Sequence, residues 1–198
     1  VLLTVLLAAC TFGLIGRLFS VAVRAVKGFY AGRFHSYLVA ALMSSLVVLA
    51  VMLAVRGVPY DGLSTWMIDA AFRGKAQLKD PFIKFLLTCL TLGAGFQGGE
   101  VTPLFDIGAS AGAVIGQALC ISPSLLAALG LISVFGCAAN TPVTTLMLGI
   151  DLFGSEGALY FVIAAVVSYH VSGHRGIYAA QRIETAKARH LDHHIGLR

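Results

Sequence analysis

Gly95-Phe-Gln-Gly-Gly-Glu-Val-Thr-Pro103-Leu-Phe-Asp-Ile-Gly108 is the stretch of this sequence that decides the fold. Its glycines let the backbone turn sharply, and Pro103 suits the first turn of a following helix. At that helix start the free N–H groups of Val101 and Thr102 would point outward, where the helix dipole adds positive potential. The stretch therefore predicts an anion site without a cationic side chain.

Two interpretations of this glycine-rich break stay open from the residues alone. Partial charges on amides would bind an anion without trapping it, which suits an ion that must leave again. The break could instead serve only to let helices pack closely, because small residues allow two backbones to approach. A stretch of small residues, Ala109 to Ala113, follows it directly.

The rest of the chain is too apolar for a domain that faces water. Of its 198 residues 58% are apolar and 12% are charged, and the mean hydropathy is +0.89. A soluble domain carries about 25% charged residues. The composition also opposes disorder, a collagen-like chain and a disulfide-stapled secreted domain. Basic clusters at 24–33 and 175–198 suit lipid head groups, so we predict no nucleic-acid partner.

The apolar runs predict an all-α, polytopic membrane protein with broken and tilted helices, in a single membrane domain over 1–198. Full spans are expected at 1–23 and 37–55, joined by an interfacial loop at 24–33. Further segments are an interfacial polar segment with a short helix at 56–80, helices at 82–99, 103–119, 123–135, 141–153 and 157–171, and a polar C-terminal helix and tail at 176–198. Several helices are too short to cross a bilayer, and broken spans are tolerated only where their backbone faces protein or a hydrated cavity.

Three further features are candidates for function. A second break at 135–142 places Asn140 or Thr141 as a helix cap, although a plain hairpin turn explains it equally well. Asp151 is an acid in an apolar helix, which is either functional or paired near the helix end. Tyr178 could aim its hydroxyl at a bound anion, or could anchor the chain at the membrane surface.

The order of these motifs resembles the second half of the CLC chloride channel and transporter family. The glycine-rich break, the Ala-Asn-Thr-Pro-Val-Thr helix and the Gly-Ile-Tyr before a polar helix all have counterparts there. Most CLC proteins carry Gly-x-Phe-x-Pro where this chain has Gly99-Glu-Val-Thr-Pro103, and the latter form is typical of the fluoride-exporting branch. Asp106 departs from the apolar residue expected at its position.

The resemblance implies an anion site at Gly99, Glu100, Val101 and Thr102, with Tyr178 as the pore tyrosine. It implies fluoride export coupled to proton import, with a chloride-selective channel or chloride/proton exchanger as the alternative. It also implies a multi-pass protein of the cell membrane, such as a bacterial inner membrane, that works as a homodimer.

The family fold has two inverted repeats, of which this chain resembles one. The resemblance therefore implies a missing N-terminal repeat that carries the gating glutamate, because no Gly-Arg-Glu-Gly or Gly-Ser-Gly-Ile-Pro segment occurs here. We predict no metal, no cofactor and no enzyme activity, since the metalloprotease motif His-Glu-x-x-His is absent.

Overall fold

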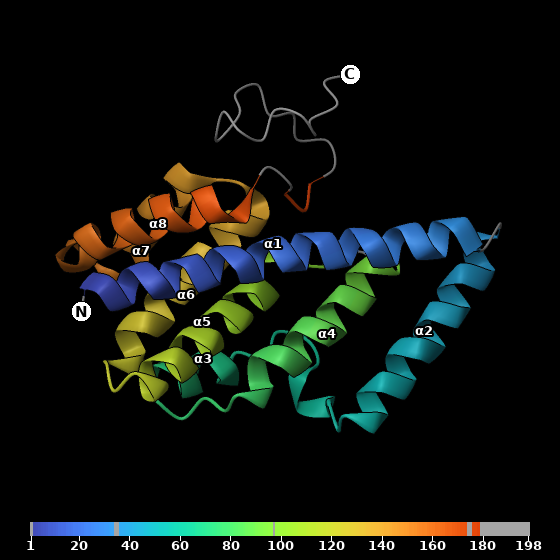
Figure 1. Ribbon diagram of the computed structural model, residues 1–198. Coiled ribbons are helices and arrows are strands. Elements are labelled where there is room, and N and C mark those ends of the chain that lie inside the picture. The colour runs from blue at the N-terminus through green and yellow to red at the C-terminus, as the bar shows by residue number, and fades with distance from the viewer. Residues whose placement is uncertain (1, 34–35, 97, 174–175, 179–198) are drawn as a thin grey trace, which may run out of the picture.

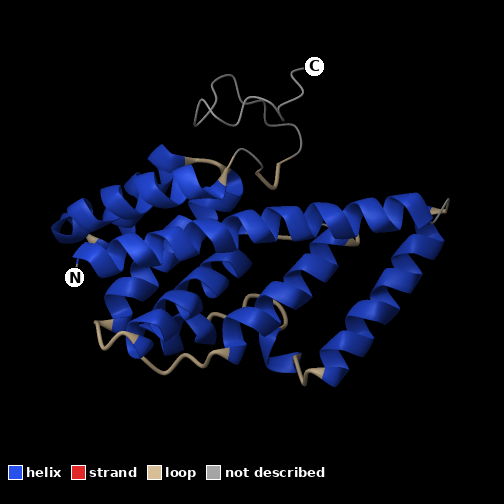
Figure 2. Ribbon diagram, viewed as in Figure 1, coloured by secondary structure: helices blue, strands red, loops and turns tan. Residues whose placement is uncertain are grey.

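The computed structural model describes residues 2–33, 36–96, 98–173 and 176–178 (Figure 1). Every regular element in these residues is a helix (Figure 2), which confirms the all-α prediction. The elements are α1 Leu2–Arg33, α2 Tyr37–Ala54, η1 Val58–Tyr60, α3 Trp66–Phe72, α4 Lys79–Gly93, α5 Val101–Ala118, α6 Pro123–Ala139, α7 Pro142–Phe153, η2 Ser155–Gly157 and α8 Ala158–Ser172. Most of the polar helix predicted at 176–198 lies outside the described residues, and the described 176–178 are not helical.

The first helix is longer than predicted. The interfacial loop predicted at 24–33 is wrong, because α1 continues through it to Arg33. This stretch holds no proline, and its helical form is supported by packing: a Cβ added to Gly93 of α4 would lie 2.5 Å from Val26 Cβ. Arg24 also donates a side-chain hydrogen bond to the Gly176 carbonyl. The 32 residues of α1 extend about 48 Å along the helix axis, whereas the hydrocarbon layer of a membrane is roughly 30 Å thick. In a membrane, α1 must therefore tilt or project beyond this layer.

The other apolar helices are short. Among the described residues, α1 is the one helix both long and apolar enough to cross a membrane. The apolar part of α2, Leu38–Ala54, falls with α6 and α7 among the shorter helices, so a second full span at 37–55 stays a prediction. In Figure 1, α2 runs back from the far end of α1 at an angle, with α4 between them.

The closest helix pair is formed by α5 and α6, which run antiparallel. A Cβ added to Gly108 would lie 2.3 Å from the Gly130 carbonyl oxygen, and one added to Gly112 would lie 1.9 Å from the Leu126 carbonyl oxygen. At the other end of the pair the rings of Phe105 and Phe135 meet edge to face, 5.3 Å apart. The start of α5 therefore lies beside the end of α6 in a tightly packed unit.

The polar segment at 56–80 folds back onto α4 through buried hydrogen bonds. The Tyr60 hydroxyl donates to Asp80 Oδ1 at 2.7 Å, and the Gln77 amide donates to Asp80 Oδ2 at 2.7 Å. Burial, together with the hydrogen bond and the charge of Asp80, raises the pKa of Tyr60 well above its ordinary value. The segment contains the predicted short helix, α3, while its interfacial location stays a prediction.

Tyr60→Phe should destabilise the protein by about 1.5–3 kcal/mol, because it removes a hydrogen bond to a buried carboxylate. Thermal unfolding of the detergent-solubilised protein measures this loss. Tyr160→Phe is the matched control, since no hydrogen bond of the Tyr160 hydroxyl is found among the described residues. Equal effects of the two substitutions would contradict a special role for the Tyr60–Asp80 bond.

Candidate functional site

The glycine-rich break separates α4 from α5 as predicted. The first of these helices spans Lys79–Gly93, so it ends six residues before the predicted end at 99. It stops earlier because Gly95 has φ +91°, a conformation that favours glycine and is incompatible with a continuing helix. The second begins at Val101, two residues earlier than predicted, with Glu100 at the N-cap. The Glu100 side chain does not cap the helix.

The first two amides of α5, those of Val101 and Thr102, have no partner in the described part of the chain. The Leu104 amide donates to the Glu100 carbonyl at 3.4 Å and closes the first turn. Pro103 has no N–H, and no backbone carbonyl among the described residues accepts from Val101 or Thr102. Val101 is 39% exposed and Thr102 is half-buried. Within the described residues these two amides are therefore free, and their role in binding an anion stays a prediction.

Tyr178 approaches the break from the other end of the chain. Its hydroxyl lies near the Glu100 carboxylate, close enough for the two groups to interact. The preceding Ile177 amide donates to the Ala138 carbonyl at 2.8 Å, which holds this segment at the end of α6. The structure thus brings Glu100 and Tyr178 together, next to the free amides of α5.

A hollow of about 290 Å³ lies beside the break. Gly98, Gly99 and Pro103 line one side, and Lys84 and Thr88 of α4 line another. The polar segment contributes residues 60–63. The break is therefore open to a space large enough for an ion with some of its water.

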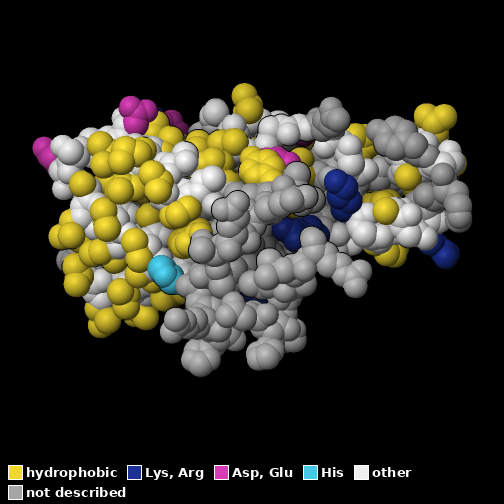
Figure 3. Space-filling model, turned by 90° about the horizontal axis from the view of Figure 1, so that it is seen from above, with side chains coloured by type: hydrophobic (Ala, Val, Ile, Leu, Met, Phe, Trp, Pro, Cys, Tyr) yellow, Lys and Arg dark blue, Asp and Glu magenta, His cyan; other side chains and the backbone are white. Residues whose placement is uncertain are grey.

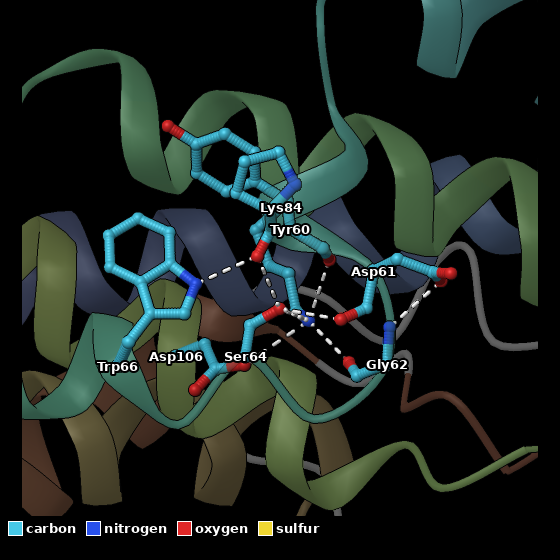
Figure 4. A network of polar contacts seen from close by, with 8 residues as sticks. Tyr60, Asp61, Gly62, Ser64, Trp66, Lys84 and Asp106 are labelled. Carbon is cyan, nitrogen blue, oxygen red and sulfur yellow. Dashed lines mark hydrogen bonds and ion pairs between the residues drawn. The ribbon is translucent and has the colours of Figure 1, made fainter.

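Sequence reasoning missed a buried ion pair at this hollow. Lys84 Nζ lies 3.3 Å from Asp106 Oδ2 of α5, and the two side chains are only 2% and 0% exposed. The same ammonium donates to the carbonyls of Gly62 at 2.7 Å and Tyr60 at 3.1 Å, and to Ser64 Oγ at 3.0 Å (Figure 4). A lone Lys and a lone Asp in two apolar segments were the available signal, since buried charges require partners.

The second break is a turn between α6 and α7. Asn140 adopts a left-handed conformation with φ 61° and ends α6, which extends to Ala139 instead of the predicted residue 135. Thr141 does not cap α7 with its side chain, and its amide donates to the Gly136 carbonyl at 2.9 Å. These features agree with the hairpin interpretation. Asp151 is exposed near the end of α7.

Apolar side chains cover the outer face of α7 and α8 (Figure 3), as expected of a surface in contact with lipid. Together with the short apolar helices and the break between α4 and α5, this surface defines a membrane protein of the broken-helix class. The model of the voltage gated chloride channel family matches residues 1–173, and the chain belongs to that family.

Relatives of this chain have also been described. A chloride/fluoride channel protein of Pseudomonas syringae pv. tomato is 37% identical over 192 residues, which cover 93% of this chain and 42% of the relative. An uncharacterized protein of Methanocaldococcus jannaschii is 32% identical over 91 residues, which cover 45% of this chain and 22% of that protein.

A solved structure of a CLC-type fluoride/proton antiporter superposes on the chain with a TM-score of 0.85 and 34% identity. The match covers 89% of this chain and 45% of the antiporter chain. The predicted resemblance to the CLC family and its fluoride/proton antiporters is therefore confirmed. The chain spans less than half the length of these relatives.

Proposed function

We propose that this chain forms one half of the ion path of a fluoride/proton antiporter in a cell membrane. The observation that carries the proposal is the pair of free amides, Val101 and Thr102, at the start of α5. The similarity to a chloride/fluoride channel protein and to a fluoride/proton antiporter supports the same substrate class.

The chemistry of the site suits a small anion. Fluoride is strongly hydrated, so compact donors must replace its water when it enters the site. The amides of Val101 and Thr102 and the Thr102 hydroxyl supply such donors, and the Gly99 backbone leaves room for the ion. Because no cation contacts the ion directly, the ion can leave again.

Glu100 and Tyr178 complete one side of the proposed site. The Tyr178 hydroxyl, which lies near the Glu100 carboxylate, would close the path beside the amides. Proton coupling requires a titratable group that opens to the path, and Glu100 is one on this chain. The gating glutamate of the first repeat is the other, and we propose it as the main proton carrier.

The rest of the site must come from another segment. Gly98, Gly99 and Val101 are exposed in this chain, so one side of the break is uncovered. We propose that an N-terminal repeat covers it, and that the complete protein is a homodimer in the lipid bilayer. It would require protons and fluoride, but no cofactor.

Ion flux from liposomes containing the full-length protein tests this function. With fluoride inside, we expect fluoride release measured by electrode, matched by proton uptake measured with an internal pH dye. Chloride release as fast as fluoride release would favour the chloride-selective alternative. Fluoride release without proton uptake would indicate a channel.

A further inference from the structure

The proposed anion site has a negative charge close behind it. Asp106 lies in the second turn of α5, about 7.5 Å along the helix axis from Val101. Its side chain is fully buried, so water does not screen its charge. An unbalanced carboxylate at this place would repel the anion that the amides attract.

Lys84 is placed to cancel that charge. It projects from α4 and lines the hollow beside Gly98 and Gly99, and its ammonium lies 3.3 Å from Asp106 Oδ2. Neither carboxylate oxygen of Asp106 has a hydrogen-bond partner among the described residues. Within these residues Lys84 is the one charged group that forms an ion pair with this carboxylate.

Lys84 also joins three parts of the structure. The Lys84 ammonium has three N–H donors, and they donate to two backbone carbonyls and one hydroxyl within residues 60–64 (Figure 4). Its positive charge also attracts the Asp106 carboxylate of α5. The polar segment, α4 and the first turns of α5 are thereby held in one arrangement around the hollow, which Gly99 and Pro103 line on either side of the free amides in sequence.

Stability alone is a weak explanation for the pair. The cost of removing two charges from water offsets most of their attraction, and apolar side chains of similar size often stabilise a buried site equally well. The electrostatic potential at the amides, in contrast, depends directly on whether both charges are present.

We propose that Lys84 is a positioning residue of the anion site, which neutralises Asp106 and sets the affinity of the α5 amides for the anion. This inference rests on the proposed function, because it concerns the same site.

Removal of the Lys84 charge and removal of the Asp106 charge should change the fluoride KM in opposite directions. Lys84→Met leaves the Asp106 charge unbalanced and should raise the fluoride KM at least tenfold. Asp106→Asn leaves a buried cation and should lower the fluoride KM several-fold, with a lower kcat because the ion leaves more slowly. The double variant Lys84→Met/Asp106→Leu is neutral again and should restore KM to within about threefold of the parent.

Flux from liposomes and fluoride titration calorimetry of the full-length protein measure these effects. We choose pH 8, because alkaline conditions favour the ionised form of a buried carboxyl. Lys79→Met is the matched control, since Lys79 is an exposed lysine on the same helix. It should leave KM unchanged.

A purely structural role makes a different prediction. The inference is overturned if both single substitutions shift KM in the same direction, or if the double variant binds no better than Lys84→Met. Should Lys84→Met fail to fold, the inference is tested by the other two variants: Asp106→Asn should lower the fluoride KM, and the double variant should have a KM close to that of the parent. A parent protein that transports chloride instead of fluoride overturns the proposed function, while the same shifts measured with chloride would still support the role of Lys84.

Discussion

Thr102→Val is expected to weaken fluoride affinity by about ten- to hundredfold. A hydrogen bond to a charged group contributes about 1.5–3 kcal/mol, and each 1.4 kcal/mol changes affinity tenfold. Valine has nearly the shape of threonine and keeps the backbone amide at the second residue of α5, so the substitution removes only the hydroxyl. The KM for fluoride release from liposomes measures the effect.

Two variants separate the hydroxyl from other effects of this substitution. Thr102→Ser keeps the hydroxyl and should retain most of the affinity. Thr91→Val changes a threonine that lines the same hollow, but whose hydroxyl donates to the Leu87 carbonyl at 2.8 Å, and should leave KM nearly unchanged. If Thr102→Val has the parent KM, the hydroxyl does not contact the ion.

The break itself was predictable because local residues determine it. Gly95 takes a positive φ that other residues avoid, and Pro103 fits the first helical turn. Both constraints act within a few residues, so the sequence alone locates the break and places the start of α5 within two residues. The end of α4 lies at Gly93, six residues before the predicted end at 99.

The course of α1 was not predictable in the same way. Charged and aromatic residues at 24–33 are typical of a membrane-surface loop, and nothing local distinguishes that loop from a helix. What decides the structure is tertiary contact, since Val26 packs against Gly93 and Arg24 binds the Gly176 carbonyl. Such contacts join distant segments and leave no periodic signal.

Tertiary contacts between distant segments also explain why the pairing of side chains at the candidate site could not be predicted. Asp106 was noticed as an unusual residue, but its partner Lys84 lies on another helix and could not be paired with it from spacing. Tyr178 was assigned to the site only through the family resemblance, because a lone tyrosine near a membrane end is more often a surface anchor. Its proximity to Glu100 depends on the folded chain.

Gly112→Ala is expected to have the largest effect on stability, a loss of about 3 kcal/mol. The added methyl group would lie 1.9 Å from the Leu126 carbonyl oxygen and 2.5 Å from its carbonyl carbon. These are backbone atoms of α6, so no side chain can rotate away and the two helices must separate. Overpacking of this kind costs about 1–3 kcal/mol, and contact with backbone places this case at the upper end.

Gly28→Ala is the matched control, because nothing lies within 4 Å of a Cβ added at that position of α1. There the change should be neutral or stabilising by up to about 1 kcal/mol, since alanine is the better helix former. Thermal unfolding in detergent compares the two variants, and a Gly112→Ala protein as stable as the parent would contradict the close approach of α5 and α6. Because α5 also carries the free amides, separation of this helix pair should displace Val101 and Thr102 and reduce fluoride binding even in the fraction that stays folded.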